Sequence, residues 1–253
     1  MTKKKESMIP YERRKLILDK LEEQEVVNLE DFNGVLQNVS LSTIRRDLQI
    51  LEAEGQIVIL RGGATKKKSG SYDSPVSSRK ILHVKEKEVV AKTAAALVKA
   101  GEVIYIDAGS TALRMIKHLK NKNISIITTN ALVMTDIAET EFKCILVGGE
   151  LLKETGSLVG PLADNALKGM YFDKAFIGAT GYDVQAGINT PDEREANKKS
   201  IVKNNSQKTY VLVDSSKEGI KTLCKAFELE ECIIITDKET DMLRKNAHYI
   251  IAH

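Results

Sequence analysis

The sequence has few residues of the kinds that form disulfides or hold metals. Its 253 residues include three cysteines and four histidines. Cys144, Cys224 and Cys232 are an odd number without C-x-x-C spacing, so we expect buried free thiols. The histidines are scattered, with no i, i+4 pair, which argues against a metal site. The sequence therefore predicts neither a metal nor another cofactor.

Long apolar runs and a strong charge excess are also missing. No apolar run approaches the ~20 residues needed to span a bilayer, and the start Met-Thr-Lys-Lys-Lys-Glu has no apolar segment behind it. We therefore expect no membrane contact, no secretion signal and a cytoplasmic location. The net charge of +3 is too small to indicate a nucleic-acid partner by itself, so the distribution of charge matters more.

The stretch Val39 to Leu51, read V-S-L-S-T-I-R-R-D-L-Q-I-L, predicts an amphipathic helix that starts at Ser40. One stripe is apolar and consists of Ile44, Leu48 and Leu51. The other side gathers hydrogen-bonding side chains, namely Ser42, Arg45, Arg46 and Gln49. Such a face suits phosphates and base edges in a DNA major groove. The alternative is a solvated helix face, with or without ion pairs from its arginines to Asp47, Glu52 or Glu54.

The segments around this helix predict a winged helix-turn-helix. A helix from Pro10 to Gln24 and a short helix from Leu29 to Leu36 precede it. Gln56 to Leu60 and the turn Arg61 to Ala64 then read as a hairpin. Helix, helix, short turn, helix and hairpin is the order of that module. Arg61 would lie where a wing meets phosphate or the minor groove.

Residues 13 to 65 resemble the N-terminal domain of the DeoR family of bacterial transcriptional regulators. The motifs that carry the resemblance are V-S-L-S-T-I-R-R-D-L-Q-I-L-E-A-E-G and R-G-G-A. The family usually has H-G-G-A in the wing, where Arg61 would keep or strengthen a phosphate contact, and a glycine where this chain has Glu25. The partner implied is double-stranded operator DNA. The predicted DNA contacts are Ser42, Thr43, Arg45, Arg46, Gln49 and Arg61.

Residues 66 to 84 lose the apolar periodicity and gain Ser, Gly and Pro, so they predict an interdomain linker. Its lysines would trail along DNA, or the segment is a charged linker without such a partner. The predicted organisation is a DNA-binding domain over residues 1–65, a linker over 66–84 and an α/β domain over 85–253.

The third segment alternates helices with short β-rich runs, which predicts a mainly parallel sheet with helices on both faces. Strands are expected at Val103 to Ile106, Ser125 to Thr128, Cys144 to Val147, Ala175 to Ile177, Thr209 to Val213 and Ile233 to Thr236. Helices are expected at Lys87 to Lys99, Ala112 to Leu119, Leu132 to Ala138, Leu162 to Lys168 and Glu193 to Val202.

Polar loops follow four of the predicted strands, and such loops converge on a ligand at the carboxyl edge of a parallel sheet. They read D-A-G-S-T, T-T-N-A, G-G-E and D-S-S-K. The first opens onto a helix, where free N–H groups suit a phosphate, although an ordinary tight turn explains it equally well. Lys217 would add a point charge. Together they indicate a small, polar, anionic ligand such as a sugar phosphate.

The motifs DAGST, TTNA, LVGGEL, FIGATGYDVQAGINTPDEREANKK and VLVDSSKEG resemble the effector domain of the same family, itself similar to ribose-5-phosphate isomerase. The resemblance implies a sensor of a phosphorylated sugar in a repressor of carbohydrate genes. The effector contacts it implies are Asp107, Gly109, Ser110, Thr111, Thr129, Asn130, Gly148, Gly149 and Lys217. Glu195 and Lys199 match a further motif. They would line the sugar site, or form an i, i+4 helix pair worth ~0.2 to 0.5 kcal/mol.

The similarity to an isomerase leaves a second hypothesis, a sugar-phosphate isomerase-like enzyme with an added DNA-binding domain. The isomerase has a G-A-D-E stretch whose carboxylates move protons. Here Gly178 to Gly181 reads G-A-T-G, although Asp107 and Glu195 would be possible substitutes. The sequence therefore favours binding without turnover and no catalytic residue. We expect a homo-oligomer, a dimer or a tetramer, that places two recognition helices on neighbouring half-sites.

Overall fold

The computed structural model describes residues 8–24, 26–37, 39–53, 56–60, 62–67, 76–137 and 140–253. The chain forms two compact units, one N-terminal and one C-terminal. Along the segment between them, Ser77–Leu82 groups with the N-terminal unit, whereas Val76 and everything from His83 onward group with the C-terminal unit.

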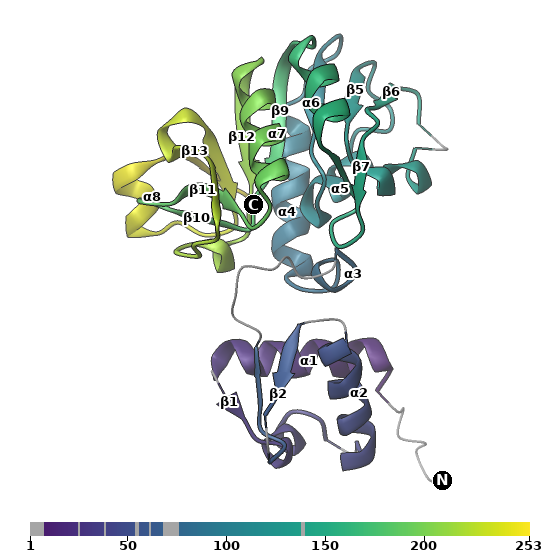
Figure 1. Ribbon diagram of the computed structural model, residues 1–253, viewed down its shortest axis with the longest axis vertical. Helices are drawn as coiled ribbons and strands as arrows, with labels where there is room; N and C mark the ends of the chain where they lie inside the picture. Colours follow the sequence, from purple (N-terminus) through teal and green to yellow (C-terminus); the bar gives the residue numbers. More distant parts are fainter. Residues whose placement is uncertain are drawn as a thin grey trace. The chain divides into compact units, whose positions relative to one another are not determined.

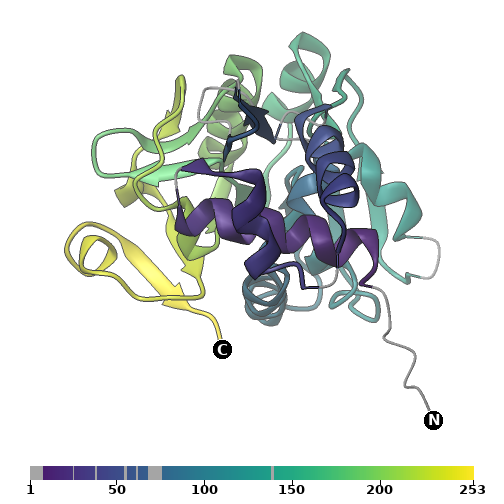
Figure 2. The same cartoon turned by 90° about the horizontal axis from the view of Figure 1, so that it is seen from below.

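The N-terminal unit is a winged helix-turn-helix, as predicted (Figure 1). Its elements are α1 (Pro10–Glu23), β1 (Val26–Val27), the 3-10 helix η1 (Leu29–Gly34), α2 (Leu41–Ala53), β2 (Ile57–Ile59) and β3 (Thr65–Lys67). The three short strands pair antiparallel in the order β1-β3-β2, so β1 adds a strand that the sequence did not predict. The second predicted helix is a 3-10 turn that ends at Gly34. Figure 2 shows α1 running across α2 within this unit.

The core of this unit confirms the apolar stripe that the sequence predicts for α2. Ile44, Leu48 and Leu51 are 0%, 2% and 0% exposed and pack in one cluster with α1, η1 and β2. The Oγ of Ser40 accepts the N–H of Thr43 at 3.2 Å, which caps α2 and explains why the helix starts here. The sequence therefore dictates both the start of α2 and its buried face.

The C-terminal unit is built on a seven-stranded sheet whose strands are all parallel, in the order β15-β14-β12-β9-β4-β5-β6 (Figure 1). The strands are β4 (Val103–Ile106), β5 (Ser125–Thr128), β6 (Lys143–Leu146), β9 (Phe172–Gly178), β12 (Ser206–Leu212), β14 (Ile233–Thr236) and β15 (His248–Ile251). Its α-helices are α4 (Val84–Ala96), α5 (Ser110–Ile116), α6 (Pro161–Lys168), α7 (Glu193–Asn204) and α8 (Asp241–Asn246). The short helix α3 (Val76–Arg79) lies in the segment between the two units.

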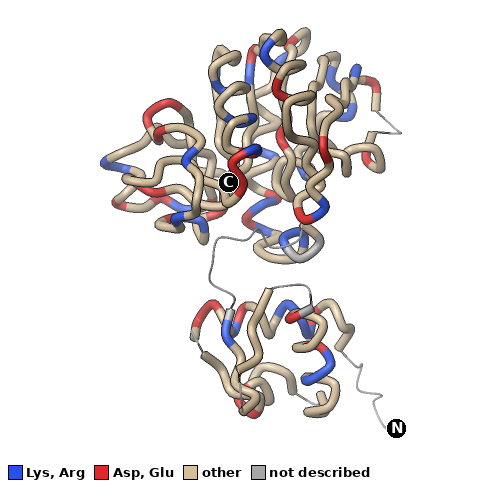
Figure 3. The backbone as a smooth tube through the Cα atoms, viewed as in Figure 1, with Lys and Arg blue, Asp and Glu red and all other residues tan. Residues whose placement is uncertain are grey.

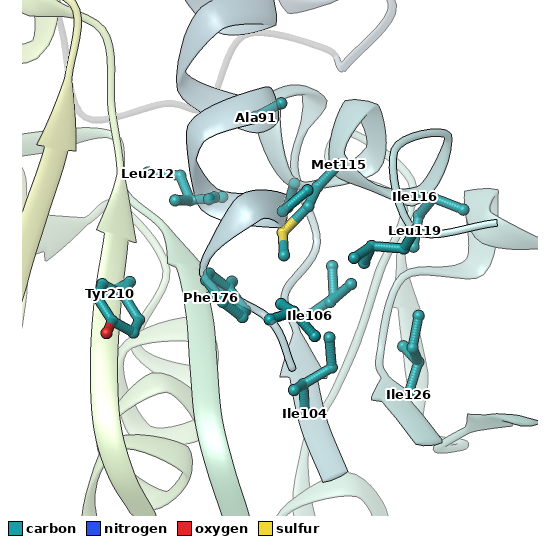
Figure 4. Close-up of a cluster of buried hydrophobic side chains, with 14 of the residues drawn as sticks. Ala91, Ile104, Ile106, Met115, Ile116, Leu119, Ile126, Phe176, Tyr210 and Leu212 are labelled. Carbon is teal, nitrogen blue, oxygen red and sulfur yellow. The ribbon is translucent and has the colours of Figure 1, made fainter. Parts of the chain in front are cut away.

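Helices cover both faces of this sheet. Successive side chains of a strand point to opposite faces, and both faces are apolar here, so each face packs against its own set of helices. Ile104 and Ile106 belong to the core beneath α4 and α5, and Figure 4 shows them among Met115, Ile126 and Phe176. Tyr105, between them, belongs to the other core, with residues of α6, α7 and α8. The predicted fold class, a mainly parallel α/β domain behind a winged helix-turn-helix, is confirmed.

Smaller elements complete the unit. They are the hairpin β7 (Glu150–Leu152) and β8 (Ser157–Val159), an antiparallel sheet of β10 (Gly181–Asp183), β11 (Gly187–Thr190) and β13 (Cys224–Phe227), and the 3-10 turns η2 (Ala131–Thr135), η3 (Ser215–Lys217) and η4 (Leu229–Glu231). The helix expected from Leu132 is the turn η2, and Ala138 lies outside the described residues.

The prediction of buried thiols is correct for Cys232 alone. Cys144 and Cys224 are partly exposed because each lies on a strand at the edge of its sheet, β6 or β13. In the described part of the chain, no helix is long and apolar enough to cross a membrane. Nor do three His, Cys, Asp or Glu side chains within the described ranges gather into a group that would hold a metal ion.

Candidate DNA-binding surface and effector site

The face of α2 opposite the core carries the predicted DNA contacts. Ser42, Arg45, Arg46 and Gln49 are exposed and Thr43 is half-buried. The Oγ of Ser40 lies 2.8 Å from both the Oγ of Ser42 and the Oγ1 of Thr43. The first turn of α2 therefore presents an ordered set of hydroxyls beside the two arginines, which form the basic stretch of this helix in Figure 3.

Arg45 and Arg46 do not form ion pairs with Asp47 or Glu52, two of the three carboxylates considered as their partners. Asp47 is buried and takes the guanidinium of Arg13, with 2.6 Å between Nε and Oδ2. Glu52 accepts the N–H of Ile59 at 2.8 Å, and Glu54 lies outside the described residues. No ion pair among the described residues involves Arg45 or Arg46, so both side chains are available to an outside anion.

A groove of about 330 Å³ lies between α2 and the turn of the wing. It is lined by Leu29, Arg45, Leu48, Gln49, Ile59, Gly62 and Gly63. The two glycines have φ values of +98° and +87°, which only glycine adopts readily, so they set the wing turn. Arg61 lies outside the described residues and its predicted contact stays a prediction.

The candidate effector site lies where the strand order of the parallel sheet reverses. β4 and β9 are neighbours at the centre, with β5 and β6 on one side and β12, β14 and β15 on the other. Ligands of open α/β sheets bind at such a point, outside the carboxyl ends of the strands. Asp107 follows β4 there, and its Oδ2 accepts the N–H of Gly178, the last residue of β9, at 3.3 Å.

Three charged side chains, those of Glu195, Lys198 and Lys199, gather with Asp107. The ammonium of Lys199 lies 2.5 Å from Oδ2 of Asp107 and 3.4 Å from Oε2 of Glu195. The ammonium of Lys198 lies 3.5 Å from Oδ1 of Asp107. No side chain of the four is more than 6% exposed. We call these four residues the buried charge cluster; its two ammonium groups balance its two carboxylates, as burial of charge requires.

Hydroxyl groups surround the buried charge cluster. The hydroxyl of Tyr105 donates to Oδ1 of Asp107 at 3.2 Å and lies 2.7 Å from Oγ1 of Thr129. Burial, and next the negative charge of Asp107, raise the pKa of Tyr105 well above its ordinary value, so the phenol stays a neutral donor. Lys198 donates to the Oγ of Ser157.

The helix α7 aims three members of the cluster at the sheet. Glu195, Lys198, Lys199 and Val202 are spaced i, i+3, i+4 and i+7, so they share one buried face. Asp192 caps the helix by accepting the N–H groups of Arg194 and Glu195. Hydrogen bonds from the Arg194 side chain are the main reason that the pKa of Asp192 is lowered. Glu195 and Lys199 therefore form the i, i+4 helix pair that the sequence suggested. The same two residues also belong to the buried charge cluster, so the two alternatives given for them are compatible.

The remaining predicted effector residues lie along the same carboxyl edge. Ser110 and Thr111 are buried at the start of α5, next to Gly109. The side-chain oxygen of Asn130 accepts the N–H of Leu132 at 3.0 Å and caps η2. Lys217 lies in η3, after β12, which is separated from β4 by β9. Their contacts with a ligand stay predictions.

The two glycines after β6 differ. A Cβ on Gly149 would lie 2.6 Å from the carbonyl oxygen of Val159, so this position needs glycine to let β8 approach. Gly148 is exposed, and a Cβ there would meet nothing within 4 Å. Only Gly148 therefore has open space in which a ligand would fit.

Sequence reasoning missed four members of the site. Lys198 has a sequence signal, since it is three residues after Glu195 and so on the same helical face. Tyr105 has one too, since strand residues at i and i+2 share a face and Asp107 is already a candidate. Thr155 and Ser157 come from the β7–β8 hairpin, which no pattern in the sequence places beside α7.

Comparison with known proteins establishes the family. Residues 13–69 match the DeoR-like helix-turn-helix domain, and residues 82–238 match the DeoR C terminal sensor domain. The chain belongs to the DeoR family of transcriptional regulators, a class of DNA-binding regulators rather than of enzymes.

The relatives cover nearly the whole chain. It is 32% identical over 240 residues to FruR, an uncharacterized HTH-type transcriptional regulator of Bacillus subtilis, covering 94% of this chain and 95% of the relative. It is 33% identical to the lactose phosphotransferase system repressor of Lactococcus lactis, covering 81% and 82%. Among solved structures, ribose 5-phosphate isomerase A of Methanocaldococcus jannaschii is 26% identical, with a TM-score of 0.39 over 52% of this chain and 53% of that one.

Proposed function

We propose that this regulator is a repressor of a carbohydrate uptake or catabolism operon, released from its operator by a phosphorylated sugar. The observation that carries the proposal is the buried charge cluster, with its surrounding hydroxyls, at the strand-order reversal of a sensor domain joined to a helix-turn-helix. The name of the Lactococcus lactis relative, a repressor of a sugar phosphotransferase system, supports the carbohydrate assignment.

The ligand chemistry follows from the groups along the carboxyl edge. Sugar hydroxyls both donate and accept, which matches carboxylates, ammonium groups and hydroxyls placed together. The phosphate would take the N–H groups and hydroxyls at Gly109, Ser110 and Thr111, where α5 begins. Asp107 and Glu195 are each ion-paired with Lys199, so we assign them to binding and to no proton transfer.

The sensor function is tested by melting the full chain with ribose 5-phosphate, fructose 1-phosphate and glucose 6-phosphate. A ligand present at 100 times its Kd stabilises the folded chain by about 2.7 kcal/mol. We expect one of the three to raise the melting temperature, whereas its parent sugar and inorganic phosphate do not. The same compound should weaken operator binding in a gel-shift titration at fixed salt. If none of the three changes either measurement, the assigned effector class is wrong.

DNA contact by α2 is tested with the operator that the full chain selects from a random pool. We propose that Arg46 contacts a phosphate, so Arg46→Ala should weaken binding and reduce the slope of log K against log salt by about one unit. Lys168→Ala removes an exposed positive charge from α6 and is the matched control. Binding by the Arg46 variant equal to that of the control would mean that Arg46 only faces solvent.

A homo-oligomer would present two α2 helices to half-sites about 34 Å, or a multiple of that distance, apart. We propose a dimer or tetramer acting in the cytoplasm, where chromosomal DNA and sugar phosphates meet. Sedimentation of the full chain gives the oligomeric state, and the spacing of protected sites in the selected operator checks the geometry. A monomer on a single half-site would contradict this arrangement.

A further inference from the structure

The β7–β8 hairpin supplies part of the wall of the buried charge cluster. The Oγ1 of Thr155, in the turn of this hairpin, donates to Oε1 of Glu195 at 3.1 Å and accepts the N–H of Ser157 at 3.2 Å. Thr155 is 4% exposed, so this hydrogen bond is shielded from water and its loss is costly. The turn is therefore tied to a carboxylate of the candidate effector site.

The same turn holds Val76, a residue of the interdomain segment 66–84. The N–H of Val76 donates to the carbonyl oxygen of Glu154 at 2.6 Å, and the Val76 side chain is buried. Glu154 and Thr155 are consecutive, so one peptide unit separates the group that holds Val76 from the group that holds Glu195. Beyond Val76 the chain runs into Ser77–Leu82, which groups with the DNA-binding unit.

Several contacts fix the turn of the β7–β8 hairpin, so a displacement of Thr155 is passed on to its neighbour Glu154. Gly156 has φ +69°, and a Cβ there would lie 2.8 Å from Leu132. Its N–H donates to Leu152 at 2.8 Å and its carbonyl accepts the N–H of Ala131 at 2.9 Å. The hairpin also binds the loop after β5, since the N–H of Leu158 donates to Thr129 at 2.8 Å. A well-packed element of this kind shifts as a body.

We propose that Thr155 is a positioning residue that couples the effector site to the interdomain segment through Glu154. The proposal rests on the proposed function, since it requires a ligand at the buried charge cluster. A ligand hydroxyl that donates to Glu195 competes with Thr155 for the carboxylate, and displacement of Thr155 moves the carbonyl that holds Val76. Because coupling is reciprocal, release of Val76 also changes the affinity for the ligand.

The first test uses the full chain without ligand and measures hydrogen exchange of the Val76 amide by NMR. Thr155→Val removes the hydroxyl at nearly constant volume, so we expect Val76 to exchange about three- to tenfold faster, the range that a net hydrogen bond covers. Thr155→Ser keeps a hydroxyl and should restore slow exchange. Thr222→Val, which removes a hydroxyl bonded to Asn189 in the same unit, is the control. Equal Val76 exchange in the Thr155→Val and Thr222→Val chains would overturn the proposal.

The second test adds the three sugar phosphates named above. In the wild-type chain, the one that raises the melting temperature should change Val76 exchange by at least about threefold, and in Thr155→Val the change should disappear although the compound still binds. A Val76 response that survives in Thr155→Val would overturn the proposal while leaving the sensor function intact. If none of the three binds, the effector class fails, and the ligand-free comparison alone decides whether Thr155 holds Val76.

Discussion

Arg13 of α1 and Asp47 of α2 form a two-pronged ion pair inside the DNA-binding unit. Nε of Arg13 lies 2.6 Å from Oδ2 of Asp47 and the second guanidinium nitrogen lies 3.3 Å from Oδ1. The Asp47 side chain is 3% exposed and that of Arg13 is 13% exposed. The pair fixes the recognition helix against the helix that crosses it, and it removes Asp47 from reach of Arg45 and Arg46.

Arg13→Ala should destabilise the DNA-binding unit by about 3–5 kcal/mol, because it leaves the buried Asp47 carboxylate without its partner. Lys15→Ala, which removes a positive charge from the same helix, should cost less than 1 kcal/mol. Urea titrations of the full chain, followed by circular dichroism, give both values. Equal costs for the two variants would mean that the pair does not hold α2.

Asp107 and Lys199 should be strongly coupled. Lys199→Met leaves Asp107 and Glu195 with less positive charge, and Asp107→Asn leaves two ammonium groups facing one carboxylate. The double variant should be more stable than the sum of the single losses predicts, with an interaction energy of about 0.5–3 kcal/mol. A double-mutant cycle measured by chemical unfolding gives this interaction energy. If the stability losses of the two single variants simply add up in the double variant, Asp107 and Lys199 are not coupled.

Gly149 and Gly148 should respond differently to alanine. The new Cβ at position 149 would lie 2.6 Å from a backbone oxygen, which cannot move away without shifting β8, whereas position 148 is open. We expect Gly149→Ala to cost about 1–3 kcal/mol and Gly148→Ala to leave the melting temperature unchanged. If Gly148 contacts the effector, its alanine variant should nevertheless bind the sugar phosphate more weakly, which calorimetric titration measures.

Asp192 should make the stability of the sensor domain depend on pH under acidic conditions. Its pKa is lowered below the ordinary value of 3.8, so the folded chain favours the carboxylate. The stabilisation is therefore present above about pH 4 and is lost as the pH falls through the folded-state pKa. Asp192→Ala should cost about 1 kcal/mol at pH 7, the worth of a helix cap, and less near pH 3. A cost that is the same at both pH values would contradict this.

Much of the fold could be predicted because local patterns decide it. The strands at Val103–Ile106, Ser125–Thr128 and Ile233–Thr236 have the predicted bounds. Each is a short run of β-branched residues with turn residues at its ends, and this local pattern is enough to predict a strand. β15 was missed, although β6, the strand at the opposite edge of the sheet, was predicted. η1 and η2 were predicted as helices because five or six residues cannot show whether a turn is α or 3-10. The short β7–β8 hairpin was missed as well.

The sequence by itself determined the family, the amphipathic helix α2 and the loops that lie along one edge of the sheet. Periodicity and turn chemistry are local, so the burial of Ile44, the exposure of Arg46 and the position of Asp107 directly after a strand could be predicted from their neighbours in the chain. Only the tertiary structure decided which partners the charges take. Lys198 and Lys199 meet Asp107, and Arg13 meets Asp47, across sequence separations that no local pattern spans. Burial makes such pairs necessary, and the order of the strands decides which ones form.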